Sequence, residues 1–357
     1  MRILYGAFSQ GNGHLSKASV LVPLLEARGH EVRVITSGPP PTSCYQFTWH
    51  RHFPGIAYVA KNGRTDYLAS FKQWTRRRPT LFKGIWAIRG IAREFRPDLV
   101  ISDFEPMTAS PLVEPGCEVV SISRQVSLLD PDVPMPPAGG FDRKMTRSVI
   151  RVFTCGADRK YGYHYEPASF RCVPPLIRAA AKQARPELGE HVLLYSGLPS
   201  FQPEPAEVAD WAKRNRQRVV AYGFAPECAI SGERYISFRR PNPQQFLEDM
   251  AQSREVITTA GLSTPIEAFL LRKPLVVVPI PRQWEQTVNA YQLHEAEIAC
   301  SVPNWDFNKI LETPAPAADH RLLSWMRTGS DYILNRLLNE PASATEEQPA
   351  DAALPAA

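Results

Sequence analysis

Three short runs in the second half of the chain decide the fold: TTAGLSTPIEA at residues 258–268, KP at 273–274 and WEQTVNAYQL at 284–293. In the first run a strand ends, Gly261 permits a tight turn, and Ser263 or Thr264 can cap a helix that has Pro265 in its first turn. The free amides and the positive dipole end of such a helix suit a pyrophosphate group. The order of strand, glycine turn and helix therefore predicts a diphosphate site at a strand end.

Carboxylate and carboxamide side chains follow in the same stretch. Glu267 lies in the first turns of the predicted helix, where its carboxylate can accept two hydrogen bonds from a ribose diol. Glu285 and Gln286 begin the next helix, after another strand, and can reach the hydroxyls of a sugar in the same crevice. Each feature alone is common at an ordinary helix start. Their order on successive strand ends is far more specific, because parallel sheets bind ligands at those ends.

These runs resemble the donor-binding half of GT-B glycosyltransferases of the MurG and UDP-glycosyltransferase kind. Members of this superfamily have a Gly-rich turn, a Thr, a helix Glu, a Lys-Pro before a strand and a Glu-Gln…Asn-Ala helix. The resemblance implies contacts to a nucleotide-sugar donor, with the diphosphate held by Gly261, Ser263 and Thr264, the ribose by Glu267, and the sugar by Glu285, Gln286 and Asn289. One departure is Ala260, where many members have a second glycine.

Strand and helix patterns alternate in both halves of the chain. This alternation predicts an α/β protein of two Rossmann-like domains with parallel sheets that face each other across a cleft, the GT-B arrangement. We place the domains and terminal segments as follows: an N-terminal acceptor-side domain at 1–178, a C-terminal nucleotide-sugar-binding domain at 190–316, a final helix at 318–339 that packs back on the N-terminal domain, and a disordered tail at 341–357.

The loop GAFSQGNGHLSK at residues 6–17 carries the second motif. A dinucleotide fingerprint would need glycine at Ser16 and an acidic residue at the end of the second strand, which ends at Thr36 instead. A nicotinamide cofactor is therefore disfavoured. The loop resembles the Gly-x-Gly-His turn of GT-B enzymes, which faces the interdomain cleft. The resemblance implies that Gly13 contacts the donor diphosphate.

His14 begins the helix after this loop, where a neutral imidazole can take the proton from an acceptor hydroxyl. Asp103 ends the strand at 98–103 and can orient and charge-stabilise that imidazole. A similar pair is catalytic in plant-type UDP-glycosyltransferases, so the resemblance implies direct displacement with inversion. A helix-start hydrogen bond for His14 and a loop cap for Asp103 are the alternative roles.

Shorter features extend the likeness. PDLVISDFE at 97–105 and VPPLIR at 173–178 resemble a MurG-like subgroup of bacterial and archaeal glycosyltransferases. Ser196 and Gly197 occupy a position that meets the donor phosphates in such enzymes. The position of Phe238 resembles the one at which the nucleotide base stacks in such enzymes. An ordinary aromatic residue of the hydrophobic core is the alternative role.

Charge is unevenly distributed along a chain of formal net charge +5. Residues 61–96 contain ten Lys or Arg, two acids and several aromatics. Three interpretations are open: a nucleic-acid surface, contact with an anionic membrane, or a solvated, partly buried pair of helices. The membrane is preferred over nucleic acid because the resemblance places this stretch in the acceptor domain. No other part of the chain supports nucleic-acid binding.

Several classes are disfavoured by what the sequence lacks. It shows no signal-peptide pattern, no run of 18 apolar residues and no CxxC among six scattered cysteines. Reduced thiols in a cytoplasmic protein are therefore expected. Asp130-Pro-Asp132 is a formal Asp-x-Asp, but it lies in a Pro-rich loop, and a phosphate site at a helix end makes a metal unnecessary. We expect neither metal nor cofactor beyond the co-substrate.

The sequence therefore predicts a metal-independent, inverting hexosyltransferase that uses a nucleotide-diphosphate sugar, with UDP preferred, and an acceptor hydroxyl. A lipid or cell-envelope precursor is one candidate acceptor, which would make the cytoplasmic protein membrane-associated. Two other functions are open: a nucleotide-sugar 2-epimerase of the same fold and a non-catalytic sugar-nucleotide-binding protein. These patterns determine neither the acceptor nor the nucleotide base of the donor.

Overall fold

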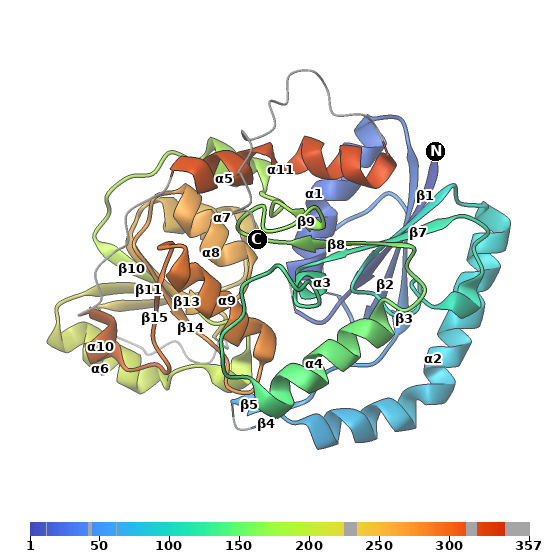
Figure 1. Ribbon diagram of the computed structural model, residues 1–357. Helices are drawn as coiled ribbons and strands as arrows, with labels where there is room; N and C mark the ends of the chain where they lie inside the picture. Colours follow the sequence, from blue (N-terminus) through green and yellow to red (C-terminus); the bar gives the residue numbers. More distant parts are fainter. Residues whose placement is uncertain (12, 42–44, 62, 225–233, 312–319, 340–357) are drawn as a thin grey trace, which may run out of the picture.

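Two parallel sheets organise the chain (Figure 1). A computed structural model describes residues 1–339 except 12, 42–44, 62, 225–233 and 312–319. One sheet has seven strands in the order β3-β2-β1-β6-β7-β8-β9, and the other has six in the order β12-β11-β10-β13-β14-β15. The predicted α/β class with two parallel sheets is confirmed. The predicted tail at 341–357 lies outside the described residues.

The first sheet and its helices come from the N-terminal half. Its strands are β1 (Arg2–Phe8), β2 (Glu31–Gly38), β3 (His50–Pro54), β6 (Leu99–Asp103), β7 (Glu118–Ser123), β8 (Arg159–Tyr163) and β9 (Cys172–Val173). A small antiparallel hairpin pairs β4 (Ala60–Lys61) with β5 (Arg64–Thr65). The helices are α1 (Gly13–Ala27), α2 (Tyr67–Phe95), α3 (Arg124–Ser127), α4 (Gly140–Phe153) and the 3-10 turn η1 (Pro111–Val113).

The second sheet begins after the segment 176–190, which follows β9. Its strands are β10 (His191–Tyr195), β11 (Arg218–Tyr222), β12 (Ile236–Arg239), β13 (Ser253–Thr259), β14 (Leu275–Val278) and β15 (Cys300–Ser301). Its helices are α5 (Ala179–Gln183), α6 (Pro205–Arg214), α7 (Pro243–Ala251), α8 (Ser263–Leu270), α9 (Trp284–Glu295) and α10 (Phe307–Leu311), with the 3-10 turn η2 (Pro199–Phe201).

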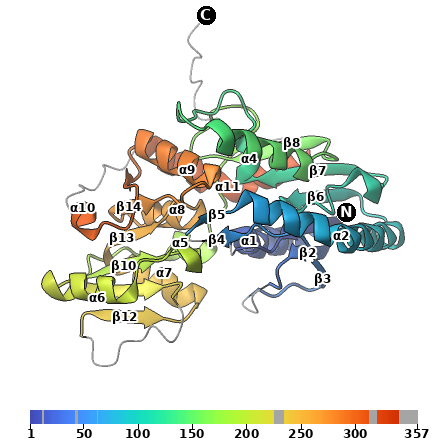
Figure 2. The same ribbon diagram turned by 90° about the horizontal axis from the view of Figure 1, so that it is seen from below.

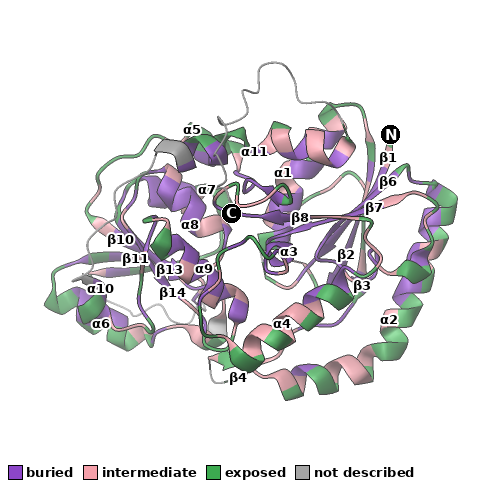
Figure 3. Cartoon of the chain, in the orientation of Figure 1, coloured by how far each residue is buried: buried purple, intermediate pink, exposed green. Residues whose placement is uncertain are grey.

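Central strands are buried along most of their length because helices cover both faces of the sheet. In β1 every residue after Arg2 is buried, and α1 places Leu15, Ala18, Val22 and Leu25 at helical spacing against it. Figure 3 shows both sheets buried between helices whose outer faces are exposed. This packing leaves the carboxyl ends of the strands free to carry loops.

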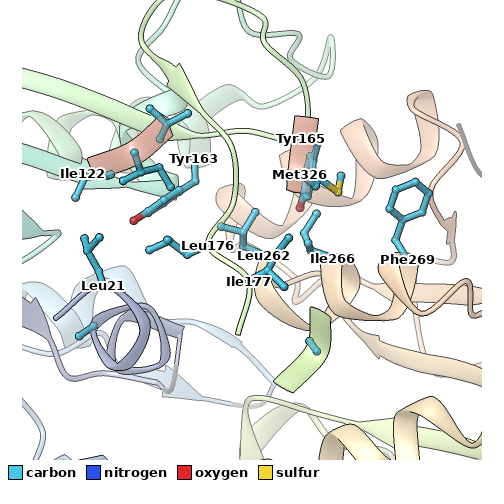
Figure 4. Close-up of a cluster of buried hydrophobic side chains, with 14 of the residues drawn as sticks. Leu21, Ile122, Tyr163, Tyr165, Leu176, Ile177, Leu262, Ile266, Phe269 and Met326 are labelled. Carbon is cyan, nitrogen blue, oxygen red and sulfur yellow. The ribbon is translucent and has the colours of Figure 1, made fainter. Parts of the chain in front are cut away.

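An apolar core continues from one sheet to the other. Figure 4 shows Leu176 and Ile177, which follow β9, between Tyr163 of the first sheet and Ile266 of α8. The last helix, α11 (His320–Leu338), adds Met326 to the same cluster. At the other end of α11, Arg159 of β8 donates hydrogen bonds to the backbone oxygens of Arg336 and Leu337, at 2.7 and 3.0 Å. The helix thus contacts β8 of the first sheet and belongs to the core cluster that both domains share.

Residues 67–95 form one helix, α2, and not the pair of helices that one of the three interpretations of this stretch supposed. Asp66 caps it by accepting a hydrogen bond from the backbone N–H of Ala69 at 2.9 Å, and Pro79 lies within it. The helix runs along the outside of the first domain in both views (Figures 1 and 2). Its outward stripe exposes four large apolar side chains: Leu68, Phe71, Phe82 and Trp86.

No helix within the described residues is long and apolar enough to cross a membrane.

Candidate active site

His14 and Asp103 meet at the carboxyl edge of the first sheet. His14 lies in the first turn of α1, and Asp103 is the last residue of β6, whose register pairs Asp103 with Ala7 near the end of β1. The His14 Nδ1 atom is 2.7 Å from Asp103 Oδ1, and both side chains are buried. Among the described residues nothing hydrogen-bonds to His14 Nε2. That nitrogen is therefore available to accept a proton.

Lys17 is a third member of this group that sequence reasoning missed. It lies three residues after His14, on the same face of α1. Its Nζ atom donates to Asp103 Oδ1 at 3.0 Å, lies 3.3 Å from His14 Nδ1, and is 4.8 Å from the centre of the Tyr163 ring. Burial acts to raise the pKa of Asp103, but the charges and hydrogen bonds of Lys17 and His14 outweigh it and lower that pKa. Asp103 is thus held as a carboxylate.

Aromatic rings surround the imidazole. The His14 ring stacks on Phe104 at 5.9 Å between centroids and meets the edge of Phe8 at 6.1 Å. Phe104 takes a left-handed conformation with φ 55° directly after β6, which turns its ring toward the histidine. Phe153 packs on Phe104 at 4.8 Å, and Tyr58 meets the edge of Phe8. Phe8, Phe104 and Phe153 are themselves buried, so the imidazole lies against an apolar core cluster.

Helix α9 of the second domain packs against this aromatic cluster. Trp284 and Val288 are buried with Phe8, Phe104 and Phe153. The approach is close, because a Cβ atom at Gly139 would lie 2.6 Å from the Trp284 ring. The start of α9, with Glu285, is thereby brought to the same side of the protein as His14.

Three of the predicted diphosphate residues lie on neighbouring loops of the second domain. Ser196 and Gly197 follow β10, and Gly261 follows the neighbouring strand β13. The Gly197 amide donates to the Thr259 hydroxyl at 3.5 Å, so the two loops are in contact. A Cβ atom at Gly13 or Gly261 would meet nothing within 4 Å, so both backbones border open space. Ser196 is buried, and its hydroxyl donates to carbonyl groups within its own loop.

The expected cap of α8 by Ser263 or Thr264 is wrong. Leu262 occupies the cap position, and within the described part of the chain no side chain hydrogen-bonds to the first amides of the helix. Ser263 and Thr264 instead lie in the first turn, partly exposed. Uncapped amides at a helix start retain their donor capacity for an anion.

Glu267 is engaged by an arginine that sequence reasoning did not assign. Arg178, which follows the VPPLI segment, donates from Nε and Nη2 to the two Glu267 carboxylate oxygens, both at 2.6 Å. Arg178 Nη1 also donates to the backbone oxygen of Pro243 at 3.2 Å. Burial alone would lower the pKa of Arg178, but the hydrogen bonds and charge of Glu267 raise it. The pair joins the interdomain segment to α8 and α7.

The three residues predicted to hold the donor sugar lie in different surroundings. Glu285 is partly exposed, and its Oε2 accepts a hydrogen bond from Gln125 Nε2 at 2.9 Å. Gln286 is buried and accepts from the backbone N–H of Ile280 at 3.1 Å. Asn289 is fully buried, and both ends of its carboxamide are engaged, with Arg124 Nε at 2.8 Å and with the Ala260 backbone oxygen at 2.8 Å. Asn289 therefore anchors the Gly261 loop.

Phe238 and Asp130 have packing and loop contacts. Phe238 is half-buried on β12, with its ring 5.1 Å from Phe224. Asp130 accepts from the Ser169 hydroxyl at 2.6 Å and from the Asp132 amide at 3.1 Å, which organises its own loop. Within the described residues no group of three His, Cys, Asp or Glu has the geometry to hold a metal.

Residues 1–312 match the family model described as glycosyl transferase family 1. The chain belongs to this family. It is therefore a glycosyltransferase. No curated protein matches the sequence.

Solved glycosyltransferases share the arrangement of the two sheets. The calicheamicin glycosyltransferase CalG4 superposes with a TM-score of 0.59 at 17% identity, over 97% of this chain and 100% of that one. UGT2 of Phytolacca americana, complexed with UDP-2-fluoro-glucose and pterostilbene, gives 0.62 at 15% identity, over 95% and 98%. The spinosyn rhamnosyltransferase SpnG, complexed with thymidine diphosphate, gives 0.57 at 15% identity, over 95% and 100%. These likenesses confirm the GT-B fold.

Proposed function

We propose that this glycosyltransferase moves a sugar from a nucleotide-diphosphate donor to an acceptor hydroxyl by a single inverting displacement without a metal. The observation that carries this proposal is the buried His14–Asp103 contact of 2.7 Å at the edge of one sheet. The Gly197 and Gly261 loops lie at the equivalent edge of the other sheet. The boundaries 1–178 and 190–316 and the MurG-like affiliation of the 97–105 and 173–178 motifs belong to the same proposal.

In the proposed reaction His14 Nε2 takes the proton of the acceptor hydroxyl as its oxygen attacks the anomeric carbon. The bond from that carbon to the donor diphosphate breaks, and the diphosphate leaves with the electron pair. Asp103 stabilises the imidazolium that forms. The uncapped amides at the start of α8, with the glycine loops, stabilise the charge that develops on the diphosphate.

On the donor side, Gly13, Ser196, Gly197, Gly261, Ser263 and Thr264 would border the diphosphate. Glu267 has lone pairs left for a ribose diol beside its bonds to Arg178, and Phe238 is the proposed base-stacking residue. Glu285 and Gln286 would bind the donor sugar, and Asn289 would position the loop through Ala260. The bound nucleotides of the plant and spinosyn enzymes support UDP or thymidine diphosphate as the leaving group.

For the acceptor we propose an apolar or lipid-linked alcohol presented at an anionic membrane. The aromatic cluster beside His14 supports the apolar part. Helix α2 supports the membrane, because its outward face combines Phe82 and Trp86 with Lys83 and the exposed Arg76 and Arg78. Apolar side chains among basic ones are the pattern of helices that bind anionic lipid surfaces.

The test compares His14→Ala with His294→Ala, a matched change at an exposed histidine at the end of α9. UDP- and TDP-sugars are first screened for thermal stabilisation of the protein. Transfer to alcohol acceptors is then measured as the amount of nucleoside diphosphate released. Loss of a general base lowers the rate by roughly 10²- to 10⁴-fold. We expect that loss in His14→Ala only, with affinity for the nucleoside diphosphate unchanged and an inverted anomeric centre in the wild-type product.

Other outcomes separate the alternatives. Full transfer by His14→Ala would refute the base assignment. Turnover of the donor without any acceptor, yielding its 2-epimer, would identify an epimerase. Binding of the donor without turnover under every acceptor would identify a sugar-nucleotide-binding protein.

A further inference from the structure

The group around Asp103 contains one cation more than a histidine–aspartate pair requires. Lys17 and His14 both direct a nitrogen at the same carboxylate oxygen, Asp103 Oδ1, at 3.0 and 2.7 Å. Lys17 is 5% exposed and Asp103 is fully buried. An ammonium removed from water is costly unless it is paired, so this placement needs a compensating interaction. The carboxylate supplies it.

The charges of the three groups determine the protonation state of the histidine. Without Lys17, a buried carboxylate would favour an imidazolium beside it, because that pair would be neutral overall. With Lys17 present, the carboxylate already has its counter-charge, and a proton on His14 would leave the buried group with a net positive charge. The 3.3 Å between Lys17 Nζ and His14 Nδ1 makes that repulsion direct.

The other titratable groups described against this site do not change the net charge of the Lys17, His14 and Asp103 group. Tyr5 of β1 and Tyr163 of β8 lie against Asp103, and burial, reinforced by that carboxylate, raises the pKa of both phenols well above the ordinary value. Both are therefore neutral. Among the residues that the structure describes, the other rings in contact with His14 are Phe8 and Phe104, which carry no charge.

We propose that Lys17 is a positioning residue that supplies the counter-charge of Asp103, so that His14 rests as a neutral imidazole ready to accept the acceptor's proton. Its Nδ1 keeps a hydrogen that it donates to Asp103, and its Nε2 lone pair is free. Lys17 touches neither substrate nor reacting atom and acts through the other two side chains. This inference rests on the proposed role of His14 as the base.

The experiment follows the His14 ring by NMR as a function of pH in the unliganded full chain, with His14→Gln used to assign its signals. Lys17→Met is expected to move the protonation midpoint of His14 up by at least about one pH unit, a tenfold gain in proton affinity. Lys17→Arg keeps the charge and should keep the midpoint. Asp103→Asn should lower it, and the double variant Lys17→Met, Asp103→Asn should return close to wild type, because both charges are then absent.

Transfer rates give a second readout. The rate of Lys17→Met should fall at neutral pH and recover as the pH rises past the shifted midpoint, which a purely structural defect would not do. An unchanged midpoint in Lys17→Met, or a double variant no closer to wild type than the single ones, would overturn the proposal. The NMR titration needs no substrate, so it separates this inference from the proposed function. If His14→Ala transferred sugar normally, the base role would fail while the charge coupling could still be measured.

Discussion

Replacing Arg124 by methionine tests how the two domains are held together. Arg124 lies on α3 of the first domain and is 1% exposed. Its Nε donates to Asn289 of α9 at 2.8 Å, Nη2 donates to Gln292 of the same helix, and Nη1 donates to the Ser127 hydroxyl at 2.8 Å and the Tyr163 backbone oxygen at 3.0 Å. One side chain thus makes all of its hydrogen bonds in a buried position between the domains.

The expected cost follows from these contacts. Each hydrogen bond from a charged donor contributes about 1.5–3 kcal/mol, and a buried acceptor left without a donor costs about 1–3 kcal/mol. Methionine fills much of the same space and removes a buried charge, which offsets part of the loss. We expect Arg124→Met to lower the free energy of unfolding by about 3 kcal/mol. Because Asn289 also holds Ala260, affinity for the nucleoside diphosphate should fall as well.

Urea unfolding followed by fluorescence measures the change, with Arg218→Met as the matched control. Arg218 pairs with Glu190 at 3.4 Å, but both side chains are mostly exposed, so its loss should cost less than about 1 kcal/mol. A separate, earlier unfolding transition for one domain is also expected in Arg124→Met. If Arg124→Met unfolded within 1 kcal/mol of wild type, the reasoning from buried hydrogen bonds would be refuted.

Two further perturbations test the membrane surface and a buried carboxyl. Replacing both Phe82 and Trp86 by serine should weaken cosedimentation with phosphatidylglycerol vesicles about tenfold or more, since each fully buried apolar side chain contributes about 1.5–3 kcal/mol. Phe170→Ser, which changes a more exposed side chain outside α2, should bind as wild type does. Equal binding by the wild type and both variants would exclude α2 as the contact. Burial raises the pKa of Glu255 to about 7, so the folded state binds its proton more tightly than the unfolded chain does. That contribution to stability is fully present below about pH 4.5 and is lost as the pH rises through about 7. The free energy of unfolding of the wild type, measured in urea, should therefore fall by about 3 kcal/mol between pH 4.5 and 8, and Glu255→Gln should remove that fall. Parallel pH profiles of unfolding free energy for the two proteins would show that Glu255 does not titrate in this range.

Much of the fold could be predicted from local patterns. Apolar runs such as VITT at 256–259 and LVVV at 275–278 predict strands buried on both faces, and the glycine turns after β10 and β13 mark where loops leave the sheet. Three of the elements that escaped prediction show the physical reason clearly. Strand β3 has the polar sequence HRHFP at a sheet edge, β8 begins with Arg-Lys, and α4 is predominantly polar, so none shows an apolar run.

The sequence predicted those site residues that can be recognised from their own position in a motif, without knowing their partners. His14 and Asp103 were found because each has a position in a recognisable motif, and the structure places them 2.7 Å apart. Lys17, Arg124 and Arg178 were missed because their partners lie far along the chain, at Asp103, Asn289 and Glu267. No periodicity in the sequence records such pairs. Lys17 alone had a local signal, its i,i+3 spacing from His14.

The contact between α11 and the interdomain segment has a mechanical consequence. A Cβ atom at Gly329 of α11 would lie 3.0 Å from the Pro175 backbone oxygen, so the helix crosses the segment where the chain first passes from one sheet to the other. The last helix and the chain between β9 and α5 are therefore in close contact where the chain first leaves the N-terminal sheet. A rotation of one domain relative to the other about this contact would displace most the elements that lie farthest from it.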